Sequence, residues 1–227
     1  PGYGASSNTW IRGMLEDEYG VAPDDMYWIE TSHSSDKKGG LNESSGGGSR
    51  YHLPADFPLT NGPAGVDESE LILSGACDAL ITAITPRVVA QGNPKVRTLF
   101  SNTRAAEQEY YRETGMFPIM HAVAIRATLA EDNPSLPAAV FHMYSQAKQT
   151  AYENLASTTV LRTSLPWTAE EYEDTRALMG DDYWRYGIDD NEKELEAMVR
   201  YAHSQGLVSK RIDYRDMFHP STLKLAG

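Results

Sequence analysis

Residues 7–29 read SNTWIRGMLEDEYGVAPDDMYWI and join a helical pattern to a short apolar run. Apolar side chains between residues 10 and 15 recur at helical spacing behind small polar residues, which predicts a helix over 7–19. Gly20 ends this pattern, and residues 26–29 predict a strand. A helix followed by a strand is a building unit of an α/β sheet, so the stretch indicates an α/β fold.

The same alternation continues through the first half of the chain, and the second half is mainly helical. Apolar runs predict strands over 79–84, 99–100 and 120–126. Helical patterns cover 68–76, 103–114, 136–156, 169–179 and 191–205. A capping box from Thr168 to Glu171 and a cap at Asp190 should begin the last two helices, and Gly206 should end the last one. Residues 31–50 are rich in Gly and Ser and predict a long flexible loop.

Charge and composition exclude several classes of protein. The chain has 227 residues, with 20 Lys and Arg against 32 Asp and Glu, so the formal net charge is −12. Nucleic acids and anionic membranes are bound by concentrated positive charge, so we expect neither as the main partner. Hydrophobic residues make up 41% of the chain and charged residues 23%, which is typical of a globular protein with a buried core.

Cys77 is the only cysteine, so no disulfide can form within the chain and no cysteine-based zinc site is expected. No run approaches the roughly 20 apolar residues that cross a bilayer. The chain begins Pro1-Gly2-Tyr3, without a basic and then apolar leader, so no signal peptide is expected in it.

Several stretches resemble one family, in the same order along the chain. The first is TWIRGML at 9–15 with EYGV at 18–21, and the most specific is TGMFPIMH at 114–121. The others are SG at 74–75, DALI at 78–81, YYR at 110–112, LPW at 165–167, LMGDD at 178–182, YG at 186–187 and QGL at 205–207. These motifs are similar to those of the 4,5-dihydroxyphthalate decarboxylases.

The resemblance implies a fold like that of the type II periplasmic binding proteins, with two α/β lobes around a ligand cleft. Residues 1–118 would form the second lobe, and the helix-rich residues 119–227 would complete the first. We expect the N-terminal part of the first lobe to be missing, which would expose an apolar face and lead either to association into a homo-oligomer or to instability. The Gly/Ser-rich residues 31–50 replace a shorter family connection, where substrate selectivity could be set.

Candidate anion-binding residues lie where a helix begins and where a predicted strand ends. Ser7, Asn8 and Thr9 precede unpaired backbone N–H groups that suit a carboxylate, although ordinary helix capping explains them equally well. Arg12 lies one turn further on and could add a bidentate contact, or merely sit in solvent. Arg87 follows the strand predicted at 79–84 and would be a second carboxylate clamp, or a surface arginine.

His121 is the candidate proton donor, because histidine titrates near neutral pH and this one follows the most specific family block. A core histidine bonded to the backbone is the alternative. His52, next to Tyr51, is the second candidate acid. Tyr111 and Tyr186 could contact the ring or hydroxyls of a substrate, or could be packing residues, and the resemblance adds Phe117 as a binding residue.

A metal site is less well defined in the sequence. His33 and His52 with Glu30 and Asp36 could bind a divalent ion, but their spacing matches no known ligand pattern. The motifs for nucleotide binding and for serine hydrolases are absent from the sequence. No cofactor is therefore assigned, and a divalent metal is kept as an open alternative.

The resemblance implies decarboxylation of an aromatic dicarboxylate, 4,5-dihydroxyphthalate or a close analogue, by protonation of the ring carbon and loss of CO2. The expected partner is thus a small aromatic carboxylate, and the expected location is the cytoplasm. The alternative is a non-catalytic solute-binding protein of the same fold, which would capture a similar anion and act in the periplasm. Fold and anion clamps alone do not separate these two functions.

Overall fold

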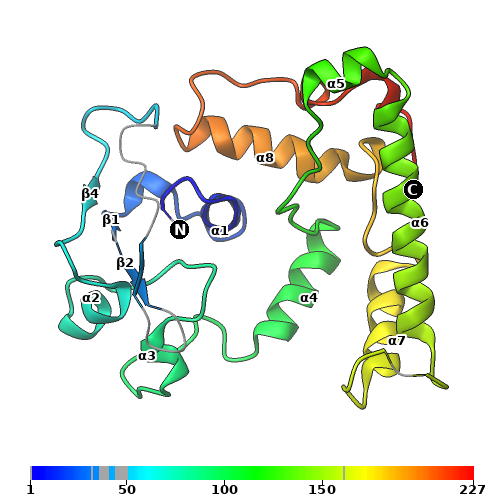
Figure 1. The fold of residues 1–227 in the computed structure, drawn as a ribbon. Helices are drawn as coiled ribbons and strands as arrows, with labels where there is room; N and C mark the ends of the chain where they lie inside the picture. Colours follow the sequence, from blue (N-terminus) through cyan, green and yellow to red (C-terminus); the bar gives the residue numbers. More distant parts are fainter. Residues whose placement is uncertain (1, 32, 36–40, 44–50, 161) are drawn as a thin grey trace. The chain divides into compact units, whose positions relative to one another are not determined.

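The computed structural model describes residues 2–31, 33–35, 41–43, 51–160 and 162–227 (Figure 1). Helices predominate: α1 (Ser6–Tyr19), α2 (Glu68–Ser74), α3 (Arg87–Ala90), α4 (Thr103–Thr114), α5 (Ala127–Asp132), α6 (Leu136–Ala156), α7 (Thr168–Met179) and α8 (Glu192–Ser204). The strands are β1 (Trp28–Glu30), β2 (His33–Ser35), β3 (Leu41–Glu43) and β4 (Leu59–Asn61). Short 3₁₀ turns are η1 (Pro23–Asp25), η2 (Asp189–Asn191), η3 (Tyr214–Met217) and η4 (Pro220–Thr222).

The strands form two small sheets. β1 and β4 pair in parallel, with Trp28 opposite Leu59, whereas β2 and β3 pair antiparallel, with His33 opposite Glu43. The predicted α/β class is therefore confirmed at the level of a mixed α/β chain that is mostly helical and carries a small parallel sheet.

The chain divides into two compact units. The first consists of Pro1–Ser101 with Ala197–Ile212, and the second consists of Asn102–Glu196 with Asp213–Gly227. Helix α8 begins in the second unit and continues in the first. The lobe boundary expected at residue 118 refers to the lobes of a longer protein and stays a prediction.

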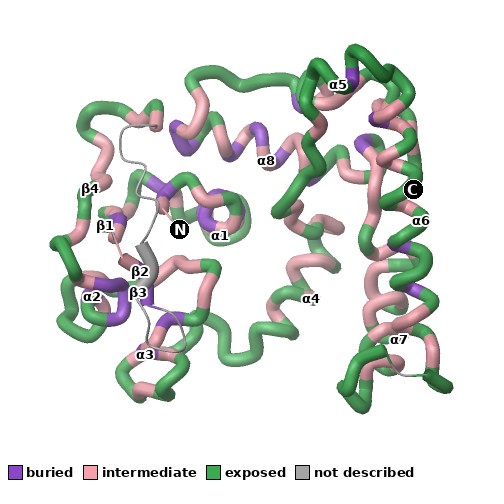
Figure 2. The backbone as a smooth tube through the Cα atoms, in the orientation of Figure 1, coloured by how far each residue is buried: buried purple, intermediate pink, exposed green. Residues whose placement is uncertain are grey.

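The core of the first unit forms where α1 meets the second half of α8, and both helices carry buried positions in Figure 2. The rings of Trp10 and Tyr201 meet edge to face with centroids 5.6 Å apart. Gly13 allows this approach, because a Cβ there would lie 2.4 Å from the Tyr201 ring. The close packing of α1 on α8 thus depends on a glycine in the middle of α1.

The second unit is built around α6. Helix α7 packs against it, and the ring of Tyr152 on α6 contacts the rings of Tyr172 and Tyr183. The ammonium group of Lys148 donates to Asp182 Oδ1 at 2.6 Å, and the Tyr152 hydroxyl donates to the same atom at 2.9 Å. These contacts hold the loop after α7 against α6.

The helix predictions are confirmed within one or two residues for α1, α2, α4, α6, α7 and α8. Gly20 and Gly115 end α1 and α4 with φ of 66° and 67°, as their sequence positions indicate. The predicted capping box of α7 is wrong, because Thr168 is already helical and its hydroxyl donates to the Leu165 carbonyl. The predicted cap at Asp190 is also wrong, since that residue lies inside η2.

The strands predicted over 79–84, 99–100 and 120–126 are wrong. None of these segments is regular, and many of their side chains are exposed. A strand needs a partner that accepts and donates its backbone hydrogen bonds, and no described segment pairs with them. The strand predicted at 26–29 is confirmed, shifted slightly, as β1.

The predicted loop at 31–50 contains β2 and β3, so it is not wholly irregular. The rest of this prediction, including Gly46 to Gly48, falls on residues outside those that the structure describes.

Candidate functional site

The first turn of α1 is open at its N-terminal end. Ala5 precedes the helix, and no side chain caps it. Asn8 and Thr9 are buried and bond back to the chain: Asn8 Nδ2 donates to the Gly2 carbonyl at 3.1 Å, and Thr9 Oγ1 donates to the Ala5 carbonyl at 3.1 Å. Ser7 is half-buried. Of the three predicted residues, Ser7 is thus the one whose side chain remains near the surface.

Arg12 points into the first unit and not toward solvent. Its side chain is 1% exposed, and its guanidinium lies 3.8 Å from the centroid of the Tyr3 ring. Nε donates to Gln205 Oε1 at 2.8 Å, and Nη2 donates to the Tyr3 carbonyl at 2.7 Å. Burial lowers the pKa of Arg12 to about 10, although Tyr3 and Tyr51 oppose this effect. In this orientation Arg12 holds the turn before α1, and a direct contact with a ligand would require it to leave these partners.

Tyr51 and Glu30 fix the same turn from the other side. The Tyr51 hydroxyl accepts from the Gly4 N–H at 3.0 Å and donates to Glu30 Oε1 at 3.2 Å. The Tyr3 N–H donates to the same carboxylate oxygen at 2.7 Å. Desolvation raises the pKa of the Tyr51 phenol.

His52 follows Tyr51 directly in the chain. Its backbone N–H donates to the Gly206 carbonyl, and its side chain is exposed. The structure therefore brings four predicted residues of the first unit, Ser7, Asn8, Thr9 and Arg12, to the first turns of α1, with His52 one residue from the tyrosine that fixes this end.

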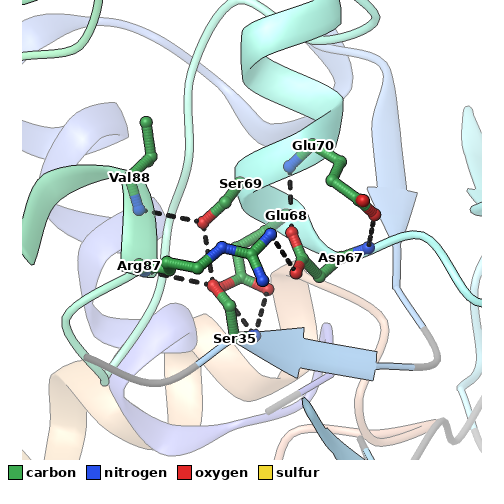
Figure 3. A network of polar contacts seen from close by, with 7 residues as sticks. All are labelled: Ser35, Asp67, Glu68, Ser69, Glu70, Arg87 and Val88. Atoms are coloured by element: carbon green, nitrogen blue, oxygen red, sulfur yellow. Dashed lines mark hydrogen bonds and ion pairs between the residues drawn. The ribbon is translucent and has the colours of Figure 1, made fainter. Parts of the chain in front are cut away.

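Arg87 lies in a separate polar network of the same unit (Figure 3). The carboxylate of Glu68 accepts from the N–H and the hydroxyl of Ser35. The hydroxyls of Ser35 and Ser69 are 2.8 Å apart, and they accept the backbone N–H groups of Arg87 and Val88. The network thus joins β2 to the first turns of α2 and α3.

The guanidinium of Arg87 already has a carboxylate partner. Its Nη2 lies 2.8 Å from Oδ2 of Asp67, whose side chain is buried. Asp67 also caps α2, since its side chain accepts from the Glu70 N–H and Glu70 bonds back to the Asp67 N–H. Because Asp67 neutralises it, Arg87 could clamp a substrate only by sharing or exchanging this partner.

The remaining predicted residues belong to the second unit. The Tyr111 hydroxyl donates to the Met179 carbonyl at 3.4 Å, and the Tyr186 ring lies 4.8 Å below the ammonium of Lys148. Both tyrosines therefore support the loop after α7. His121 lies in an irregular segment, is exposed, and makes no side-chain hydrogen bond or ion pair that the described part of the chain reveals.

Phe117 is held in place by residues that the sequence did not single out. Its N–H donates to Glu194 Oε1 at 3.1 Å, and its ring packs against Trp184 with centroids 5.4 Å apart. The Glu194 side chain is 2% exposed, and its carboxylate also pairs with Arg185 at 3.2 Å. In the sequence Glu194 looks like an ordinary acidic residue of a first helical turn, so no local signal marks it.

A cavity of about 340 Å³ lies beside Glu194. Its lining residues are mostly charged and are Gly115, Arg185, Asp189, Asp190, Glu192, Lys193 and Glu194. The four carboxylates outnumber the two cations, so the cavity is a poor site for an anion.

No group of three or more His, Cys, Asp or Glu is arranged to hold a metal ion in the described ranges. Asp36, one of the four residues named for a metal, falls outside these ranges. In the same part of the chain, no helix is long and apolar enough to cross a bilayer.

The fold and these polar clusters define a mixed α/β protein. The N-terminal end of α1 has no side-chain cap, and the buried carboxylate of Glu194 binds the backbone N–H of Phe117. The chain is 32% identical over 224 residues to the 4,5-dihydroxyphthalate decarboxylase of Comamonas testosteroni, a match that covers 99% of this chain and 66% of that protein. It is 30% identical over 112 residues to the 4,5-dihydroxyphthalate decarboxylase of Pseudomonas putida, which covers 49% of this chain and 41% of that protein. No protein-family model matches. The chain is therefore a homologue of the 4,5-dihydroxyphthalate decarboxylases that spans just under two thirds of the first relative, and the resemblance inferred from its motifs is confirmed.

Proposed function

We propose that the protein decarboxylates an aromatic dicarboxylate, 4,5-dihydroxyphthalate to protocatechuate or a close analogue. The observation that carries this proposal is the identity of 32% to one decarboxylase along 99% of the chain. The proposal includes the two-lobed architecture similar to that of type II periplasmic binding proteins, and a cytoplasmic location.

The chemistry follows from the substrate. Each hydroxyl of 4,5-dihydroxyphthalate is para to one carboxylate, so loss of a phenolic proton delivers electron density to the carbon that bears the departing group. An acid then protonates that carbon. The bond to the carboxylate breaks, its electron pair returns to the ring, and CO2 leaves as the ring regains aromaticity. Electrons balance without an oxidant or a reductant.

We assign roles to residues of each unit separately. In the first unit, the open N–H groups of α1 and the Ser7 hydroxyl bind the carboxylate that is retained. Arg12 holds the turn before α1 through its bond to the Tyr3 carbonyl. In the second unit, His121 donates the proton to carbon, because it is exposed and can be recharged by water. His52 is the second candidate acid.

The remaining predicted residues have supporting roles in this proposal. Phe117 and Tyr186 bring aromatic surface toward the substrate, and Tyr111 supports the loop after α7. Arg87 contributes a carboxylate contact only if it exchanges Asp67 for the substrate.

The test is incubation of the protein, expressed from its complete gene, with 4,5-dihydroxyphthalate in the presence and absence of a chelator. Protocatechuate is followed by chromatography and CO2 by its release. We expect one CO2 for each protocatechuate formed. Tight binding without turnover in both conditions would refute the decarboxylase and favour the solute-binding alternative.

Three histidine variants then assign the acid. His121→Ala should abolish turnover and keep binding, whereas His203→Ala, a matched exposed histidine on α8, should leave turnover unchanged. If His52→Ala is inactive and His121→Ala is active, the two roles are reversed.

A further inference from the structure

We infer that Glu194 is a positioning residue, which holds the start of the segment 117–121 and thereby places His121. The inference rests on the proposed function, since it concerns the segment that carries the proposed proton donor. Glu194 does not reach the reacting atoms. It acts through the backbone of Phe117.

Two neighbouring residues of α8 bind the chain at Phe117, where this segment starts, and at Thr114, three residues earlier. Glu194 Oε1 accepts the Phe117 N–H at 3.1 Å, and Lys193 Nζ donates to the Thr114 carbonyl at 3.3 Å. The Thr114 hydroxyl donates to the Tyr110 carbonyl and accepts the Met116 N–H. Residues 114–117 are therefore tied both to α4 and to the first turn of α8.

A buried carboxylate at this position destabilises the folded state unless close partners compensate for its lost hydration. Glu194 is 2% exposed, and a buried charge loses several kcal/mol of hydration, which only close partners return. Its partners are Arg185 at 3.2 Å and the N–H of Phe117. A charged acceptor forms a shorter and stronger bond to an N–H than a neutral one does. An apolar side chain in place of Glu194 could not bind the Phe117 N–H. The buried carboxylate therefore fixes the position of Phe117.

The anchor limits where His121 can lie. His121 is the fourth residue after Phe117, so it stays within about 14 Å of the anchor even at full extension. Pro118 has a fixed φ, which narrows the range further. Residues 119–126 form no helix or strand. Loss of the anchor should therefore displace His121 without unfolding the unit.

Neighbouring acids provide a matched control. Glu192 is also in the first turn of α8, but its carboxylate bonds to Tyr214 and Arg215 and makes no described contact with residues 114–121. Glu194→Gln keeps an oxygen that can accept the Phe117 N–H, loses the charge, and replaces the other carboxylate oxygen by an NH2 group. Glu194→Ala loses both.

The experiment measures kcat, KM and hydrogen exchange in the wild type, Glu194→Ala, Glu194→Gln and Glu192→Gln. We expect Glu194→Ala to lower kcat by about tenfold or more, since small displacements of a reacting group cost that much, and to change KM by less than about threefold. Glu194→Gln should recover most of kcat, and Glu192→Gln should match the wild type. The Phe117 amide, which donates to Glu194, should exchange faster in Glu194→Ala and not in Glu194→Gln, with thermal unfolding of each variant as the check on folding.

Wild-type kcat in Glu194→Ala, unchanged exchange of the Phe117 amide, or a Glu194→Gln variant as slow as Glu194→Ala would each overturn the inference. Failure of the proposed function looks different. In that case the wild type itself produces no protocatechuate, while the exchange data still decide whether Glu194 holds the segment.

Discussion

Replacing Arg12 by methionine removes a buried charge and keeps an unbranched side chain of similar length. Arg12 is the donor to Gln205 Oε1 and to the Tyr3 carbonyl, and both acceptors are buried with it. The substitution therefore tests whether the hydrogen bonds of Arg12 contribute more to the free energy of unfolding than its desolvation costs.

The magnitude follows from three opposing effects. Each buried acceptor that loses its donor costs about 1–3 kcal/mol. Loss of the contact with the Tyr3 ring costs about 1–2 kcal/mol in a desolvated site. In the other direction, burial lowers the pKa of Arg12 from 12.5 to about 10. Removal of the buried charge should therefore stabilise the folded state by about 3 kcal/mol. The hydrogen bonds and the ring contact together exceed this gain, and we expect a net loss of about 2 kcal/mol.

Urea unfolding followed by tryptophan fluorescence measures this loss, because Trp10 and Trp28 belong to the same unit. With a slope of about 2 kcal/mol per molar urea, the midpoint should fall by about 1 M. Arg97→Met, at an exposed arginine of this unit, should shift the midpoint by less than about 0.3 M. A midpoint for Arg12→Met equal to or above that of the wild type would refute the reasoning, because desolvation would then outweigh the bonds.

Three further substitutions test the packing and the charges. Gly13→Ala should destabilise the first unit by about 1–3 kcal/mol despite its better helix propensity, because its Cβ would lie 2.4 Å from Tyr201; a more stable variant in urea would contradict the packing. Asp17→Asn tests how the free energy of unfolding changes at acidic pH. The bonds from Arg200 and Tyr201 hold the pKa of Asp17 below 3.8, so its contribution is complete above that pH and is lost as the pH falls through the lower folded value. The variant should thus be less stable than the wild type near neutral pH and approach it in urea titrations as the pH falls below 3.8; a constant difference would argue against the pair. Lys148→Met should destabilise the second unit by about 1–2 kcal/mol in thermal or urea unfolding, less than a fully buried pair would, because its carboxylate partner is 41% exposed; no change would show that the pair contributes nothing.

The helices could be predicted from the sequence because their signals are local. In α1 and α4 the apolar spacing and the terminal glycines lie within one segment, so the structure follows the pattern closely. The strands could not be predicted in this way. Residues 79–84 have an apolar composition, but a strand also needs a partner, which is a property of the whole chain.

The place of Arg12 in its helix was predictable from the sequence, but the direction of its side chain was not. Arg12 was named from its place one turn into α1, and it lies there, but its partner Gln205 is 193 residues away in the sequence and turns it inward. Glu194 was not named at all, since its bond to Phe117 joins segments 77 residues apart. Single-sequence patterns carry no information on such pairs.

The two serine hydroxyls beside Glu68 have a consequence for the kinetics of folding. Ser35 bonds to groups 33 and 52 residues further along the chain, so its contacts can form only after large loops have closed. We expect these contacts to form after the transition state, so their loss should speed unfolding more than it slows folding. Truncating Ser35 to alanine should therefore shorten the lifetime of the folded first unit, and with it the resistance to proteolysis, while the folding rate stays nearly the same.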